Sequence, residues 1–583
     1  MKWRPFILFL LLAPVLIQAQ KPARKVDSLQ LKIDALIKDM TLDEKIGQMT
    51  QVTLSVVAQN GWGNQDGALD TAALRKAIQD YKVGSILNTT AHALSVETWR
   101  QIQTQIQDEA RNTRLKIPVI YGLDGIHGQT YTLKATLFPQ SIAMAATRNP
   151  ELVRAAAKIT AKELRASGVR WNFAPVLDCG RQPLWSRFPE TYGEDVYIGK
   201  TLGAAAIQAY QEDGLNNPTA VAACMKHYLG YSASRTGKDR TPSYMPEIEM
   251  REYYLPQFRE AVKAGAATIM VNSGEINGVP VHASKYLLND VLRKELGFQG
   301  VIVTDWEDII RLHTRHLVAS TPRQAVAMAV NAGIDMSMVP GDFSFFDLLK
   351  EAVQKNEVPM SRIDDAVRRI ITLKARVGLF EYPYPEPQAE PYFGMPEYQY
   401  VALNAAHEAM TLLKNQDGVL PLADNKRVLV VGPTSQSISA LNGCWSYTWQ
   451  GKEEQWYPSN SKTIAQAINE KLGGHAIIVG GKGFDNPDNT NADKLRSAAS
   501  GADVIVLCLG ENAYAESPGN IADLALPDNQ IALAKAAIAT GKPVILVLAE
   551  GRPRFITSIE PQIKGILMAY WSGKKTAEAV ADV

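Results

Sequence analysis

Residues 300–308 read GVIVTDWED, and this stretch decides the fold that we predict for the chain. Val, Ile and Val in succession are typical of a short strand buried on both faces, as strands in parallel sheets are. The strand is followed by the hydroxyl residue Thr304 and the carboxylate residue Asp305. In a (β/α) barrel all strand ends open on one face, where active sites lie. Asp305 is therefore a candidate site residue, or else the N-cap of the next helix.

The same order of an apolar run followed by polar residues recurs on both sides of this stretch. Lys226 and His227, for example, directly follow one such run. Strand-then-helix repetition over residues 27–375 predicts an α/β fold, a (β/α)8 barrel of the TIM type, with a doubly wound open sheet as the alternative. The apolar runs are at residues 83–87, 117–122, 169–176, 220–225, 267–271, 301–304 and 334–338.

A proline-rich and aromatic stretch at residues 376–397 reads as an extended linker. Beyond it the strand–helix rhythm restarts, so residues 398–583 are predicted to form a smaller α/β (αβα) sandwich domain. The chain ends inside a helical segment, and we expect this domain to be incomplete. Its apolar runs are at residues 428–431, 476–479, 504–509, 544–548 and 566–569.

Residues 1–19 have the pattern of a secretory signal peptide. Lys2 and Arg4 precede an apolar run at residues 6–17, and Ala19 provides a small residue at a cleavage point. The run is short for a membrane-spanning helix, which makes a retained anchor the less favoured alternative. We expect an exported protein, periplasmic or secreted, with no membrane attachment after cleavage.

Charge and cysteine content exclude other classes. Lys and Arg number 61 against 60 Asp and Glu, a net charge of +1, whereas nucleic-acid-binding proteins normally carry a basic excess. The four cysteines are far apart, without zinc-like spacing, so we expect free thiols in the core. Asp124 and His127 lack a third ligand at suitable spacing, and the glycine-rich loop 121–128 lacks the Gly-Lys-Ser/Thr of a phosphate cradle. We predict no metal and no cofactor.

Three loops combine aromatic and charged side chains, as binding loops commonly do. Residues 181–195 read RQPLWSRFPETYGED, residues 442–451 read NGCWSYTWQG, and residues 510–519 read GENAYAESPG. Trp306, next to Asp305, is a flat apolar platform of the kind on which sugar rings stack. Taken singly, each of these features is also common in structural or surface positions.

Together these motifs resemble those of glycoside hydrolase family 3, the broad group of β-glucosidases and β-glucan exohydrolases. The resemblance runs in order from about residue 30 to the end of the chain. It implies a (β/α)8-like barrel followed by an α/β sandwich, with the site where the two meet. This division agrees with the one predicted above from the strand pattern.

The resemblance also implies roles for single residues. Asp305 resembles the catalytic nucleophile, and Glu516, from the second domain, resembles the acid/base, with Glu511 as the alternative. The residues that align with those holding hydroxyls of the terminal sugar are Asp124, Arg187, Lys226 and His227. The aromatic pair that clamps the next sugar is matched by Trp306 and Trp449.

The implied mechanism is retaining. Asp305, kept ionised by neighbours such as Lys226 and Arg187, attacks the anomeric carbon. Glu516, whose pKa must be raised, protonates the leaving oxygen and then activates water. The chain departs from the family pattern at Thr304, where Ser is usual, and at Ser273, where related exohydrolases carry Tyr.

We therefore predict an exo-acting retaining β-glucosidase that releases glucose from β-glucans or oligosaccharides. Its predicted partner is this saccharide substrate, and the sequence identifies no protein partner. Alternatives within the family are a β-xylosidase and a β-N-acetylglucosaminidase, although residues 231–240 lack the Asp-His pair of the aminosugar branch. Alternatives from other classes are a barrel lyase or aldolase with Lys226 as a Schiff base, and a non-catalytic sugar-binding protein.

Overall fold

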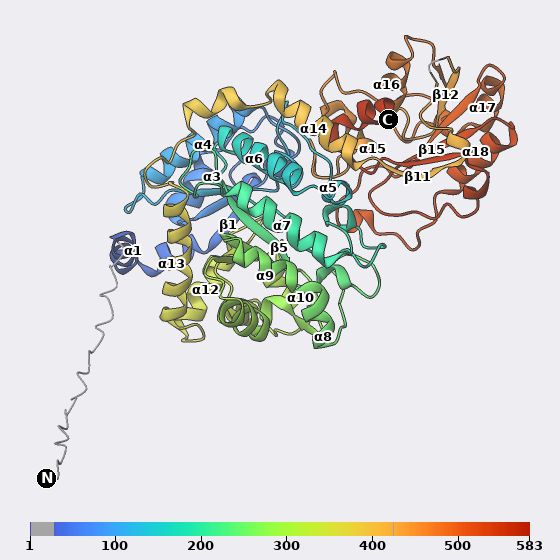
Figure 1. Ribbon diagram of the computed structural model, residues 1–583. Helices are drawn as coiled ribbons and strands as arrows, with labels where there is room; N and C mark the ends of the chain where they lie inside the picture. The colour runs from blue at the N-terminus through green and yellow to red at the C-terminus, as the bar shows by residue number, and fades with distance from the viewer. Residues whose placement is uncertain (2–27, 424) are drawn as a thin grey trace.

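The computed structural model describes residue 1, residues 28–423 and residues 425–583. Apart from Met1, the predicted signal peptide at residues 1–19 lies outside them. Two lobes lie side by side, with the chain passing from one to the other through α14 (Pro396–Ala409) (Figure 1). Within the described part of the chain, no helix has the length and apolar character needed to cross a membrane.

The first lobe is a barrel of eight parallel strands in the order β10-β1-β2-β3-β4-β5-β6-β9. The ring closes because Val303, at the end of β9, pairs in parallel with Met336, just before β10. Thr304 strengthens this closure, since its hydroxyl accepts a hydrogen bond from the Met338 amide at 2.8 Å. The predicted barrel is confirmed, and the doubly wound open sheet is excluded. The strands are β1 (Thr50–Thr53), β2 (Ser85–Leu87), β3 (Ile120–Leu123), β4 (Trp171–Asn172), β5 (Ala222–Tyr228), β6 (Thr268–Val271), β9 (Val301–Val303) and β10 (Ser337–Met338).

Helices surround the barrel, and their ends follow the sequence signals expected for helix termini. The side chain of Asn149 caps α6 (Pro150–Ala166) by accepting the Glu151 amide, and Pro150 occupies the first helical position. The other helices of this lobe are α1 (Ser28–Asp39), α2 (Leu42–Gln48), α3 (Thr71–Arg75), α4 (Val96–Arg111), α5 (Ser141–Thr147), α7 (Val196–Tyr210), α8 (Glu247–Glu249), α9 (Pro256–Lys263), α10 (Asp308–Thr314), α11 (Pro322–Ala332), α12 (Ser344–Gln354) and α13 (Met360–Arg376).

The second lobe is a six-stranded sheet in the order β11-β16-β15-β14-β12-β13. It is parallel except for β11, and alternate strand residues enter two hydrophobic clusters, one on each face. The predicted α/β sandwich is confirmed. Its strands are β11 (Thr411–Asn415), β12 (Val428–Val431), β13 (Ile477–Ile478), β14 (Val504–Gly510), β15 (Val544–Ala549) and β16 (Gly565–Met568). Its helices are α15 (Ser439–Asn442), α16 (Ile464–Lys471), α17 (Ala492–Ala499), α18 (Asp528–Ala539) and α19 (Thr576–Asp582).

Polar contacts join the loop at residues 442–451 to the barrel. The Gln140 side-chain amide donates to the carbonyl oxygens of Asn442 and Cys444 at 3.0 and 2.8 Å. His127, considered above as a metal ligand, has its Nε2 3.0 Å from the Cys444 carbonyl and its Nδ1 2.8 Å from that of Phe138. Nε2 thus contacts the second lobe, whereas Nδ1 fixes the ring within the barrel lobe.

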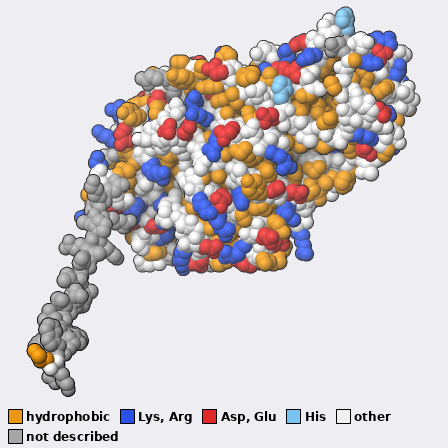
Figure 2. Space-filling model, in the orientation of Figure 1, with side chains coloured by type: hydrophobic (Ala, Val, Ile, Leu, Met, Phe, Trp, Pro, Cys, Tyr) orange, Lys and Arg blue, Asp and Glu red, His pale blue; other side chains and the backbone are white. Residues whose placement is uncertain are grey.

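Two further sequence predictions concern cysteines and surface charge. The four cysteines are free and buried, as expected, with Cys508 inside β14. On the face seen in Figure 2, basic and acidic side chains are interspersed over both lobes. This mixture agrees with the near-zero net charge of the sequence.

Candidate active site

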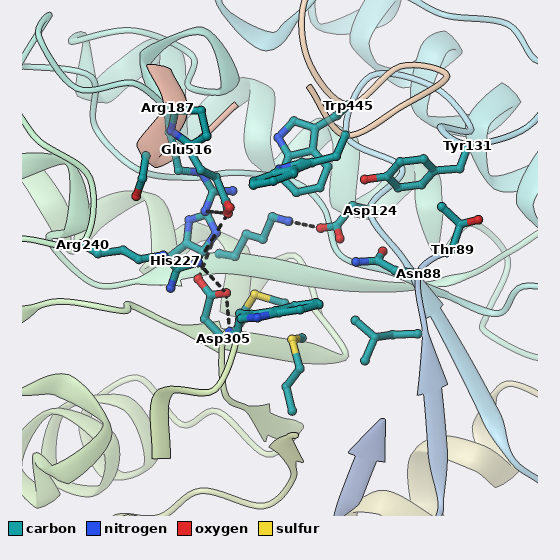
Figure 3. A pocket seen from close by; sticks show the side chains of 18 of the residues that line it. Asn88, Thr89, Asp124, Tyr131, Arg187, His227, Arg240, Asp305, Trp445 and Glu516 are labelled. Atoms are coloured by element: carbon teal, nitrogen blue, oxygen red, sulfur yellow. Dashed lines mark hydrogen bonds and ion pairs between the residues drawn. The ribbon is translucent and has the colours of Figure 1, made fainter. Parts of the chain in front are cut away.

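A cavity of about 570 Å³ lies where the barrel strand ends face two loops of the second lobe. All eight residues proposed from the sequence line it, and Figure 3 shows most of its charged side chains converging there. The barrel contributes Asp124, Arg187, Lys226, His227, Asp305 and Trp306, and the second lobe contributes Trp449 and Glu516.

Asp305 follows β9 directly, and its side chain is held by hydrogen-bond donors. The Trp306 amide donates to Oδ1 at 2.6 Å, and the Ser273 hydroxyl lies 2.8 Å from Oδ2. Burial would raise the pKa of Asp305, but the guanidinium groups of Arg240 and Arg187 outweigh it and hold this pKa below its ordinary value. Asp305 is therefore an ionised carboxylate in the cavity wall. It does not cap α10, whose N-cap residue is Glu307.

Glu516 is held between the lobes on the loop after β14. Its backbone has φ 51° and ψ −145°, a conformation that non-glycine residues rarely adopt. Hydrogen bonds on either side fix it: Gln450 pairs with the Ala515 backbone at 3.1 and 3.2 Å, and the Ser517 hydroxyl donates to Asp239 of the barrel at 3.0 Å. The interface between the lobes thus sets the position of this carboxyl group.

The electrostatic state of Glu516 is opposite to that of Asp305. Burial raises the pKa of Glu516 to about 7, against the lowering effect of Arg187 and Arg240. The Glu516 Oε1 lies 3.1 Å from Arg187 Nη1 and 3.6 Å from Arg240 Nη2. Near neutral pH the site therefore combines an ionised carboxylate with one that can hold a proton.

Arg240 connects the two carboxylates, and sequence reasoning missed it. Its Nη2 lies 3.7 Å from Asp305 Oδ1, so one guanidinium nitrogen faces both acids (Figure 3). A 2.8 Å hydrogen bond from Nη1 to the Ser273 hydroxyl fixes the guanidinium. This shared contact restricts how far apart the acids lie, and it accommodates the separation of about 5–5.5 Å used by retaining glycosidases.

Lys226 has a different partner from the one predicted. Its Nζ lies 2.5 Å from Asp124 Oδ1 and 5.7 Å from the ring centre of Trp445. Of the two neighbours expected to keep Asp305 ionised, Arg187 lowers its pKa together with Arg240, whereas the expected part of Lys226 is corrected. Lys226 and Asp124 instead form a buried ion pair at the inner end of the cavity.

His227 and Arg187 are each fixed by a buried acid. His227 Nδ1 lies 2.8 Å from Asp178 Oδ2, and its Nε2 is directed to Asp305 Oδ2 at 4.0 Å. Arg187 donates two hydrogen bonds of 2.8 Å to Glu190 and keeps Nη1 for Glu516. These contacts orient polar groups toward the cavity before any ligand arrives.

Glu511, the alternative acid/base, is held by hydrogen bonds within the second lobe. Its carboxylate accepts hydrogen bonds from Arg552 at 3.1 Å, from Arg554 at 3.0 Å and from the Tyr514 hydroxyl at 3.0 Å. It is absent from the residues that line the cavity. Glu516 is therefore the acid that the second lobe presents to the site.

Tryptophan side chains line the cavity from both lobes. Trp306 and the 39% exposed Trp449 were expected, whereas Trp62 and the buried Trp445 were not. Trp445 could have been found from the sequence, because it belongs to the aromatic loop at residues 442–451. Trp62 has only two flanking glycines as a local signal.

Comparisons with known proteins agree with this architecture. The glycosyl hydrolase family 3 N-terminal domain matches residues 41–373, and the C-terminal domain of the same family matches residues 410–583. The lysosomal beta glucosidase of Dictyostelium discoideum is 41% identical over 94% of this chain and 70% of its own length. The periplasmic beta-glucosidase of Salmonella typhimurium is 32% identical over 94% and 71%. A crystal structure of beta-glucosidase from Listeria innocua in complex with glucose has a TM-score of 0.83 and 29% identity, covering 95% of this chain and 74% of the other.

Proposed function

This chain belongs to glycoside hydrolase family 3, and we propose that it is an exo-acting retaining β-glucosidase, which hydrolyses terminal β-D-glucosyl residues of β-glucans or oligosaccharides. One observation carries the proposal. The ionised Asp305 and the protonatable Glu516 face the same guanidinium nitrogen at the edge of a cavity with a polar inner end. Two carboxyl groups whose environments separate their pKa values are the pair that glycoside hydrolysis requires.

In the proposed first step an Asp305 oxygen attacks the anomeric carbon. The bond to the leaving oxygen breaks, and Glu516 gives its proton to that oxygen. In the second step Glu516, now a carboxylate, removes a proton from water. The water oxygen displaces Asp305 from the anomeric carbon, so two inversions give net retention.

The deeply buried polar lining of the cavity supports exo action. Lys226 and His227 are each 1% exposed, and Asp124 is 6% exposed, so these polar groups lie deep in the cavity lining, as a site for one terminal sugar requires. We assign these residues and Arg187 to the hydroxyl groups of one terminal sugar. The Lys226–Asp124 pair offers charged donors and acceptors, and His227 Nε2 offers a ring nitrogen.

The test is a comparison of p-nitrophenyl β-glucoside with the β-xyloside and the β-N-acetylglucosaminide. We expect the highest kcat/KM for the glucoside and, by NMR, the β-anomer of glucose as the first product. Faster turnover of the xyloside or the aminosugar would reassign the terminal sugar. First appearance of the α-anomer would contradict the retaining mechanism.

We also propose that the protein is exported and loses residues 1–19. The sequence pattern of that segment supports this, and a relative named as periplasmic is compatible with it, although another is named as lysosomal. N-terminal sequencing of protein recovered from the periplasm or medium of a bacterial host is expected to start at Gln20. An intact Met1 in that fraction would contradict cleavage.

A further inference from the structure

Arg552 is a buried arginine that the proposed reaction does not use. It lies in the loop that follows β15 in the second lobe, and only 2% of its surface is exposed. A buried guanidinium must find acceptors for its donors, because an unpaired charge away from water is costly. The side chain of Arg552 finds them in two loops of the active site, one from each lobe.

Arg552 holds both ends of the loop that carries Glu516. Near the start of that loop, Glu511 accepts a hydrogen bond from Arg552 Nε at 3.1 Å and one from its backbone amide at 3.3 Å. At the far end, Nη2 donates to the Gly519 carbonyl at 2.6 Å, and the Gly519 amide donates to the Glu516 carbonyl at 2.8 Å. Between these ends, the Tyr514 ring centre lies 4.2 Å from the guanidinium carbon.

The same guanidinium reaches the barrel loop that carries Arg187. Its Nη1 donates to the Leu184 carbonyl at 2.9 Å. The neighbouring Gly551 packs against Pro189 so closely that an added Cβ atom would lie 2.5 Å from the proline Cγ. Arg187 lies between these two contacts in the chain, and its Nη1 is 3.1 Å from Glu516 Oε1. One buried side chain thus joins the backbones on both sides of this ion pair.

We propose that Arg552 is a positioning residue for the acid/base, because it fixes the loop of Glu516 against the loop of Arg187. This inference rests on the proposed β-glucosidase function. The guanidinium is a planar fork that donates in several directions at once, which suits it to joining three segments. Glu516 has a backbone conformation that is rare outside glycine, and such a conformation persists only where its surroundings hold it. Without Arg552, the Glu516 carboxyl moves away from the leaving oxygen.

The experiment measures kcat/KM of Arg552→Lys for a β-linked glucose disaccharide, p-nitrophenyl β-glucoside and 2,4-dinitrophenyl β-glucoside. Lysine keeps a positive charge beside Glu511, but its single side-chain nitrogen cannot also reach the two carbonyl groups. Displacing the acid matters most where the leaving group most needs a proton. We expect losses of about hundredfold for the disaccharide, about tenfold for the p-nitrophenyl glucoside and less than about threefold for the dinitrophenyl glucoside.

Sodium azide provides a second readout. In the second step Glu516 must activate water, whereas azide attacks the anomeric carbon without a general base, releases Asp305 and gives β-glucosyl azide. Azide should therefore raise kcat of Arg552→Lys for the dinitrophenyl glucoside and leave wild type unchanged. If Arg552→Lys does not fold, Glu511→Gln weakens the same anchor from the other side, and it should give the same order of losses and the same response to azide.

Arg554→Gln is the matched control. Arg554 also donates to Glu511, at 3.0 Å, but within the described part of the chain its other side-chain hydrogen bond is to Ala525 of its own lobe. It should stay within about threefold of wild type on all three substrates.

Equal losses of Arg552→Lys on the three substrates, or no loss on the disaccharide, overturn the positioning role while β-glucosidase activity stands. The same order of losses in Arg554→Gln overturns it too, because the effect would then belong to Glu511 alone. A wild-type enzyme that turns over none of the three substrates overturns the proposed function, and the inference falls with it.

Discussion

Replacing Arg240 by Gln removes the charge that Asp305 and Glu516 share. The Arg240 Nη2 lies 3.7 Å from Asp305 Oδ1 and 3.6 Å from Glu516 Oε1. Two unit charges about 4 Å apart attract each other by about 4 kcal/mol when the effective dielectric constant is about 20. Arg187, Ser273 and the Trp306 amide remain in the variant and continue to stabilise the carboxylates. We therefore expect only about half of this energy to be lost, which raises each carboxyl pKa by about 1–2.

The sign of the effect is the same for both acids. A positive charge favours the carboxylate form, so its removal raises the pKa of Asp305 from its low value and that of Glu516 from about 7. In the kcat/KM profile the acid limb reports the nucleophile and the basic limb reports the proton donor. The basic limb should move to higher pH, whereas the acid limb stays below the pH range of the assay even after the shift. The maximum of kcat/KM should fall by about tenfold to hundredfold because the carboxylates lose their common anchor.

The assay is kcat/KM for p-nitrophenyl β-glucoside from pH 4 to 10. Arg240→Lys should return the basic limb toward wild type. Arg235→Gln is the matched control, because Arg235 belongs to the same loop, contacts the Tyr244 ring and does not line the cavity. A basic limb that stays in place in Arg240→Gln, or that moves to lower pH, would refute the reasoning.

Three further predictions follow from the same geometry. Glu516→Gln should remove the basic limb and slow p-nitrophenyl β-glucoside far more than a 2,4-dinitrophenyl glucoside, whose leaving group needs little protonation; equal losses would argue against a proton-donor role. Lys226→Met should destabilise the fold by about 3–5 kcal/mol in denaturant unfolding, since it leaves Asp124 buried and unpaired, and adding Asp124→Asn should recover part of that loss. Ser273→Ala should cost about 1–3 kcal/mol, because it removes the hydroxyl whose single proton is shared between Asp308 at 2.5 Å and Asp305 at 2.8 Å, whereas an unchanged unfolding midpoint would contradict these contacts.

The barrel could be predicted because most of its strands are short apolar runs followed by polar residues. β9, with Val-Ile-Val before Thr304 and Asp305, is the clearest case. β1 was missed, since Thr50–Thr53 reads TQVT and has no apolar run. Its burial depends on partners distant in sequence: the Gln51 side chain donates to the Ser85 hydroxyl of β2 at 2.8 Å. Such pairing is invisible in a local pattern.

The candidate site could be assembled from motifs, but its charge arrangement could not. Asp305, just after β9, and Lys226, near the end of β5, share a position that the barrel dictates. Arg240 and Trp62 lie in loops whose course depends on contacts elsewhere, with Ser273 and with Thr90 respectively. The sequence of residues 231–240 contains no motif that marks Arg240 as a site residue. The pairing of Lys226 with Asp124 likewise required the relative position of two strands.

The most direct test of the central claim is mass spectrometry after incubation with 2,4-dinitrophenyl 2-deoxy-2-fluoro-β-glucoside. The fluorine slows hydrolysis of the glycosyl-enzyme more than its formation, so a covalent sugar accumulates on a retaining enzyme. We predict one fluoroglucosyl label on the peptide that contains Asp305, and none in Asp305→Asn. A label on another peptide, or no label on folded wild-type protein, would contradict the assignment of Asp305 as the nucleophile of a β-glucosidase.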